Sequence, residues 1–166
     1  MTKNEQIAPY GAFPGEEGES LRLEGFLPYR LSLLATEVSQ TLASAYGQRF
    51  GISIPEWRVL ATLGQFGTAT ARDIGAHSRM HKTTVSRAVA TLEKRKLVLR
   101  SANRADMREA FLTLTDAGSA IYRDIVPMAR SFTETLCAGL SGEERDMLDT
   151  LLDRLAARVA DLGGKT

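Results

Sequence analysis

The chain has a single cysteine, Cys137, so an internal disulfide framework and a zinc site of clustered cysteines are both excluded. Long apolar runs are also missing, and no segment is predicted to span a membrane. The first residues lack a basic stretch followed by an apolar one, which argues against a secretory signal. These features lead us to expect a cytoplasmic protein with no membrane partner.

Motifs typical of enzymes are missing as well. The sequence has no glycine loop of the phosphate-binding type and no G-x-S-x-G motif. Acidic pairs such as Glu143-Glu144 fall on a predicted helix face that we expect to be solvated, and no base stands beside a nucleophile. The sequence therefore predicts a protein that is not an enzyme and uses no cofactor.

Charge is distributed unevenly along the 166 residues, although the net charge is only +1. Residues 1–71 hold 5 Lys and Arg against 7 Asp and Glu, residues 72–108 hold 10 against 3, and residues 109–166 hold 6 against 10. A basic segment between acidic flanks is the pattern of a polyanion-binding surface. A solvated positive face without a partner is the alternative.

Apolar spacing predicts mostly helices. After a glycine- and proline-rich tail over residues 1–27, steps of three and four residues predict helices over 28–50, 55–66, 70–78 and 82–95. The period then changes to that of a hairpin, with strands at 97–99 and 110–114. Two further helices follow, one starting at Thr115 and bent at Pro127, the other opened by a capping pair, Ser141 and Glu144.

This order predicts a mainly α-helical winged helix-turn-helix with a small hairpin wing. We divide the chain into a flexible tail (1–27), a dimerisation helix (28–54), a DNA-binding domain (55–114) and C-terminal dimerisation helices (115–166). The last helix has a wide leucine-rich face that needs a partner, which favours a homodimer. In the helix over 82–95, the polar residues near its start suit base edges and phosphates in a major groove: His81, Lys82, Thr83, Thr84, Ser86 and Arg87. Free amides at the helix start would add to phosphate binding.

Three sequence segments at matching intervals resemble the MarR family of bacterial transcription regulators. They are Thr83-Thr84-Val85-Ser86-Arg87, then residues 92–98 (LEKRKLV), then Asp106-x-Arg108 followed by Leu112-x-Leu114-Thr115. The resemblance covers about residues 28–162. It implies a homodimer that binds an operator in double-stranded DNA as a repressor or activator, and that in many members is released by a small aromatic anion.

The resemblance also implies roles for single residues. Arg87 matches an arginine expected to read guanine, while Lys82, Thr83, Thr84 and Ser86 match positions that touch bases or backbone. Arg108 matches a wing arginine that enters the minor groove, and Asp106 matches the acidic residue that orients that arginine or its neighbour. Met107 replaces a cation common in the family, for which Arg104 can compensate. Lys96 stands where many members have glycine, so a left-handed residue there would carry about 1 kcal/mol of strain.

Four other side chains leave two interpretations open each. His77 and His81 are four residues apart but lack the other features of a metal site, so exposed or phosphate-contacting histidines are the alternative. Trp57 is either core or the wall of a ligand pocket, and Arg30 either holds an effector carboxylate or lies on the surface. Cys137 is either a buried thiol or a redox switch. For the whole chain, the alternative to a DNA-binding regulator is a dimeric helical adaptor that binds another protein.

Overall fold

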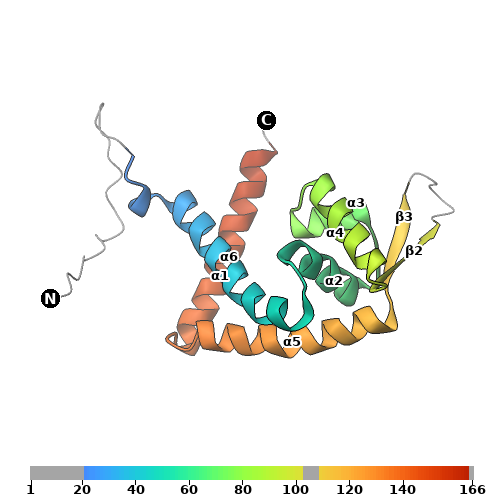
Figure 1. The fold of residues 1–166 in the computed structure, drawn as a ribbon. Coiled ribbons are helices and arrows are strands. Elements are labelled where there is room, and N and C mark those ends of the chain that lie inside the picture. The colour runs from blue at the N-terminus through green and yellow to red at the C-terminus, as the bar shows by residue number, and fades with distance from the viewer. Residues whose placement is uncertain (1–20, 103–108, 165–166) are drawn as a thin grey trace.

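The elements of the chain follow the predicted order (Figure 1). The structure, a computed structural model, describes residues 21–102 and 109–164. It confirms the mainly α-helical winged helix-turn-helix. Its elements are the 3-10 turn η1 Leu23–Gly25, α1 Leu27–Phe50, α2 Ile54–Phe66, β1 Thr68–Thr70, α3 Ala71–Ser78, α4 Lys82–Lys94, β2 Val98–Ala102, β3 Ala110–Leu114, α5 Asp116–Leu136 and α6 Gly142–Gly163.

Side-chain caps fix several of these helix starts. Ser141 forms the predicted capping box with Glu144, Thr70 forms another with Asp73, and Ser53 forms a third with Glu56. In each box the two residues satisfy amides that lack a partner within the helix. Hydrogen bonds from Thr70 hold the pKa of the Asp73 carboxyl below its ordinary value, because they favour the charged form.

The sheet has one strand more than predicted. β1 was missed, and it pairs antiparallel with β3 so that Thr68 faces Thr113 and Thr70 faces Phe111. β3 lies in the centre, and its other neighbour is β2, with Val98 opposite Leu114. The predicted hairpin is thus the outer part of a three-stranded sheet. Its tip at 103–108, with Arg104, Asp106 and Arg108, lies outside the described residues.

One apolar core holds together the winged helix-turn-helix from α2 to β3, which we call the reading domain. The stripe predicted for α4 is buried, as are Leu112 of β3 and Ile125 of α5. Pro127 lies inside α5, which continues through it to Leu136. Two large apolar side chains of the flanking helices are uncovered within one chain: Leu34 of α1 is 56% exposed and Leu136 of α5 is 53% exposed.

The terminal helices leave an apolar surface uncovered. Figure 1 shows α5 running below α1 and α2, with α6 rising past α1. Every described side chain of α6 is exposed except the half-buried Arg145. We define the terminal apolar surface as the exposed large apolar residues of α1 and α6: Tyr29, Leu31, Leu33, Leu34, Met147, Leu148, Leu151, Leu152, Leu155, Val159 and Leu162.

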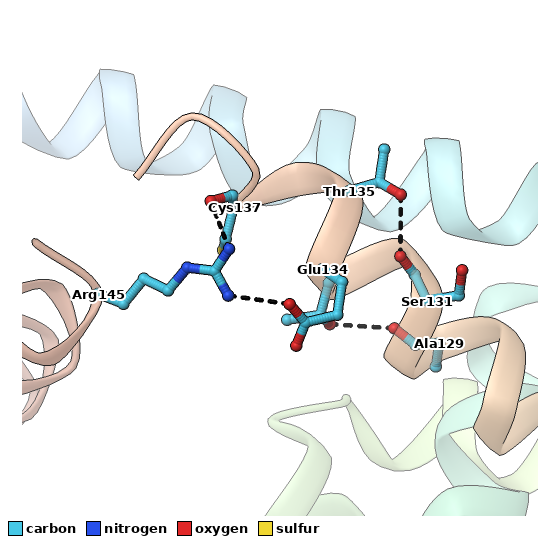
Figure 2. Close-up of polar contacts among 7 residues, drawn as sticks. Ala129, Ser131, Glu134, Thr135, Cys137 and Arg145 are labelled. Atoms are coloured by element: carbon cyan, nitrogen blue, oxygen red, sulfur yellow. Dashed lines mark hydrogen bonds and ion pairs between the residues drawn. The ribbon is translucent and has the colours of Figure 1, made fainter. Parts of the chain in front are cut away.

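The corner between α5 and α6 is fixed by Arg145 (Figure 2). Its Nη1 donates to Glu134 Oε2 at 2.9 Å and its Nη2 donates to the carbonyl of Cys137 at 2.8 Å. Both partners lie at the C-terminal end of α5, where helix carbonyls lack partners and a cation is favoured. The direction of α6 is therefore set by contacts at its first turn, while the rest of the helix projects freely.

Within the two described ranges, no helix has the length and apolarity that crossing a membrane requires.

Candidate nucleic-acid interface

The helix α4 separates a buried side from an exposed side. Val85, Ala88, Val89 and Leu92 are buried in the core. The polar residues predicted to reach DNA lie on the other side: Lys82, Thr83, Ser86 and Arg87 are exposed and Thr84 is half-buried. The structure thus brings this part of the predicted set together on one face at the start of α4.

His81 has a local structural role at this helix start. It is the N-cap of α4, and its Nδ1 accepts from the amide of Thr83 and lies 2.8 Å from Thr83 Oγ1. The amide of Thr84 donates to the carbonyl of His81 at 2.9 Å. The prediction of free amides for a phosphate is therefore wrong for Thr83 and Thr84, whose amides are already bonded. Acceptance at Nδ1 also requires that this nitrogen be unprotonated.

Two ion pairs attach the sheet to the helices of the reading domain, and the sequence analysis missed both. Arg100 of β2 makes a two-bond contact with Glu93 of α4, with distances of 2.9 and 3.0 Å. These bonds raise the pKa of the Arg100 guanidinium above its ordinary value. Arg72 of α3 lies 3.2 Å from Glu109, which immediately precedes β3. The base of the wing is thus held against both helices of the helix-turn-helix.

The end of α4 has the backbone geometry that the sequence analysis considered for Lys96. Its φ is 58°, in the left-handed region. Arg79, which ends α3, is the other non-glycine residue with positive φ within the described ranges, at 55°. The predicted strain of about 1 kcal/mol therefore applies to Lys96.

A groove lies between α2 and α3. It has a volume of about 460 Å³ and is lined by Trp57, Arg58, Ala61, Thr62, Gln65, Phe66, His77 and Ser78. Trp57 is half-buried, with its ring 5.7 Å from that of Tyr46 and 6.1 Å from that of Tyr122. Trp57 therefore packs on Tyr46 and Tyr122 and lines part of the groove, while its role as the wall of a ligand pocket stays a prediction.

The remaining candidates lie apart from one another. Arg30 is exposed in the first turn of α1, sixteen residues or about 24 Å along the helix from Tyr46, so one chain does not bring it to Trp57. His77 stacks on Phe66 with ring centroids 4.5 Å apart. Cys137 is half-buried at the end of α5. Among the residues that the structure describes, no three His, Cys, Asp or Glu side chains gather as a metal site would require.

Comparison with known proteins finds similarity to one family of regulators. Residues 52–110 match the model of the MarR family. The uncharacterized HTH-type transcriptional regulator YwaE of Bacillus subtilis is 26% identical over 139 residues, which cover 83% of this chain and 81% of that protein. A solved MarR/EmrR family transcriptional regulator from Acinetobacter sp. ADP1 is 26% identical with a TM-score of 0.77, covering 85% of this chain and 99% of that one.

A third similar protein has a known regulator of its DNA binding. BpsR of Bordetella bronchiseptica is 25% identical, with a TM-score of 0.65, over 76% of this chain and 98% of that one. Its structure concerns the regulation of its DNA binding by 6-hydroxynicotinic acid. YwaE and the Acinetobacter protein are transcriptional regulators, in agreement with the prediction that the chain is not an enzyme.

Proposed function

This chain belongs to the MarR family of winged helix-turn-helix transcriptional regulators, and we propose that it binds a pseudo-palindromic operator as a homodimer. The observation that carries the proposal is the division of α4. Its apolar side is buried in the core, while Lys82, Ser86 and Arg87 project from the opposite side. A helix held in this way presents short polar groups and cations at the depth that a major groove requires.

The homodimer is supported by the terminal apolar surface. The seven α6 members of that surface are each between 39 and 67% exposed, and α6 has no extensive contact with α2, α3, α4 or the sheet. A second copy would bury this surface, since apolar area removed from water contributes about 25 cal/mol per Å². Two copies joined there would carry two α4 helices, which suit two half-sites with centres about 10 base pairs apart.

We propose that the chain represses transcription. A dimer that covers an operator excludes other proteins from the same DNA. We further propose that a small aromatic carboxylate releases it, which BpsR supports because 6-hydroxynicotinic acid is such a compound. The groove between α2 and α3 is the candidate site, since it has aromatic walls and Arg58 in its lining. Arg30 remains a second candidate for the carboxylate.

Salt-dependent binding to DNA tests the proposal. The purified chain would select duplexes from a random library, and its affinity for a recovered site and for a scrambled duplex would be titrated at several salt concentrations. We expect preference for the recovered site and a steep loss of affinity with salt, because each neutralised phosphate releases counterions. If neither duplex binds at low salt, the adaptor alternative becomes the better interpretation.

The effector is tested separately. A panel of phenolic and pyridine carboxylic acids would be added to the complex with the recovered site, with benzyl alcohol as the uncharged control. We expect the acids alone to weaken binding, and Arg58→Gln and Arg30→Gln to show which cation holds the carboxylate. Unchanged affinity across the panel would contradict release by an aromatic acid while leaving DNA binding intact.

A further inference from the structure

The C-terminal end of α4 is bonded directly to the end of α1. Arg95, which follows the last residue of α4, donates from Nη1 to the carbonyl of Gly51 and from Nη2 to the carbonyl of Phe50, both at 2.7 Å. Carbonyls at the end of a helix lack partners within it and carry the negative end of its dipole, so a forked guanidinium satisfies two of them at once. Arg95 thus joins α4, the reading helix, to α1, which contributes to the terminal apolar surface.

The residues that follow α4 are also bonded to the start of α5. Thr115, the N-cap of α5, donates from Oγ1 to the carbonyl of Lys96 at 2.8 Å and from its amide to the carbonyl of Leu97 at 3.1 Å. Gly118 makes this approach feasible, because a Cβ at that position would overlap the Leu97 carbonyl. Residues 95–97 therefore form one junction that contacts both α1 and α5.

The backbone at this junction is held in an uncommon conformation. Lys96 has a φ of 58°, which costs energy for a residue with a side chain and persists where surrounding contacts determine it. Arg95 on one side and Thr115 on the other supply those contacts. The direction in which α4 leaves the rest of the chain is consequently set at residues 95–97.

We propose that Arg95 is a positioning residue that sets the half-site spacing accepted by the dimer. It lies eight residues, or about 12 Å, beyond Arg87, so it acts on the far end of the reading helix. Its guanidinium is occupied by the α1 carbonyls, and its effect on DNA would pass through the angle of α4. This inference rests on the proposed dimeric DNA binding, whose failure the experiments below report separately.

The first test measures spacing preference. Wild type and Arg95→Met would be titrated against duplexes whose half-site centres lie about 9, 10, 11 and 12 base pairs apart. We expect wild type to prefer one spacing and the variant to lose about 3- to 30-fold of that preference, the range for residues that couple two elements. The salt slope should stay unchanged, because no phosphate contact is removed.

Two further variants separate the fork from the charge. Arg95→Lys keeps the charge without the planar fork, so it should resemble Arg95→Met in spacing preference. Lys94→Gln removes a neighbouring charge, and within the described residues Lys94 makes no hydrogen bond to α1, so its spacing preference should match wild type. Equal weakening at all spacings with a smaller salt slope would identify Arg95 as a phosphate contact and overturn the inference, as would an unchanged preference.

A second measurement needs no DNA. A spin label would be placed on the exposed position of Ala90→Cys in α4, in a Cys137→Ser background, and the distance between the two labels of a dimer measured. We expect a narrow distance distribution that Arg95→Met broadens, even though the variant stays folded. A distribution as narrow as that of the parent would overturn the inference. If no label pair is detected at all, the dimer itself is absent and the proposed function fails instead.

Discussion

Arginine side chains around α4 differ in what they already contact. Arg72 and Arg100 pair with carboxylates and Arg95 with the carbonyls of α1, so these three cations of the basic segment serve the fold. Arg87 is exposed on the reading face. The charge excess of residues 72–108 therefore overstates the charge that is available to DNA.

Replacing Arg87 by alanine should remove base reading. Because its planar fork matches the two acceptors of a guanine, we expect a loss of about 1–3 kcal/mol on the selected operator and a flattened preference at one base pair of each half-site. Titration against operator and scrambled duplexes would measure both effects. Arg130→Ala, an exposed arginine of α5, is the control. An equal loss on both duplexes would show that Arg87 anchors the backbone.

The wing arginine should behave differently from Arg87. Arg108 lies outside the described residues, and the family resemblance assigns it to the minor groove, where it senses shape and potential. We expect Arg108→Ala to weaken binding to all duplexes more evenly and to reduce the salt slope by about one counterion. The same titrations at several salt concentrations would check this. A loss confined to the operator would instead assign base reading to the wing.

Tyr46 gives the chain an alkaline dependence of stability. The residue is 1% exposed, and burial raises the pKa of its hydroxyl to about 12, although the charge of Arg58 lowers it. Because the folded state favours the neutral phenol, it is stabilised fully at a pH below the ordinary tyrosine pKa of 10.0. This stabilisation is lost as the pH rises toward 12, the pKa in the folded state. Urea unfolding at about pH 9 and about pH 11 should therefore show a larger loss in wild type than in Tyr46→Phe. Equal losses in the two proteins would contradict this assignment.

At the scale of elements, local signals predicted the helices well. Thr70 with Asp73 and Ser141 with Glu144 lie within four residues of each other, so their caps are visible in the sequence. β1 has three residues, too few for an alternating pattern, and its partner lies more than forty residues later. Strand pairing over such a distance cannot be inferred from local periodicity.

The sequence predicted only part of the candidate site. The polar face of α4 followed from its 3.6-residue period, which fixes where the buried stripe lies. The bonds of Arg95 to Phe50 and Gly51 were missed, because nothing near Arg95 in sequence indicates an acceptor 44 or 45 residues away. The role of His81 as an N-cap was missed for another reason, since histidine is uncommon there and its ring nitrogen replaces the usual side-chain oxygen.

The contact between Gly118 of α5 and Leu97, the residue before β2, should not tolerate an added methyl group. Alanine at Gly118 would push against the Leu97 carbonyl, a backbone atom that cannot turn aside, so we expect about 1–3 kcal/mol of destabilisation. Gly142→Ala is the matched control, because a Cβ there meets nothing within 4 Å. Urea unfolding of both variants measures the difference. Similar stability of the two would show that the junction is more deformable than its contacts indicate.

At the scale of the whole molecule, the terminal apolar surface should determine the oligomeric state. Light scattering should give twice the chain mass for wild type, and the double variant Leu151→Glu, Leu155→Glu should give the single mass, because it would bury charge at the interface. Ala160→Glu is the control, since nine residues or about two and a half turns place it opposite Leu151. A wild-type monomer, or a double variant that stays dimeric, would contradict the proposed interface.

The separation of α6 from the reading domain has a genetic consequence. A chain with Arg87→Ala keeps every residue of α6, so in a cell that makes both forms it would assemble with wild-type chains. With equal synthesis about one quarter of the dimers would contain two intact reading helices, as expected for random pairing across a two-fold interface. The altered allele should therefore be trans-dominant in a reporter strain, and adding Leu151→Glu and Leu155→Glu to the same allele should make it recessive.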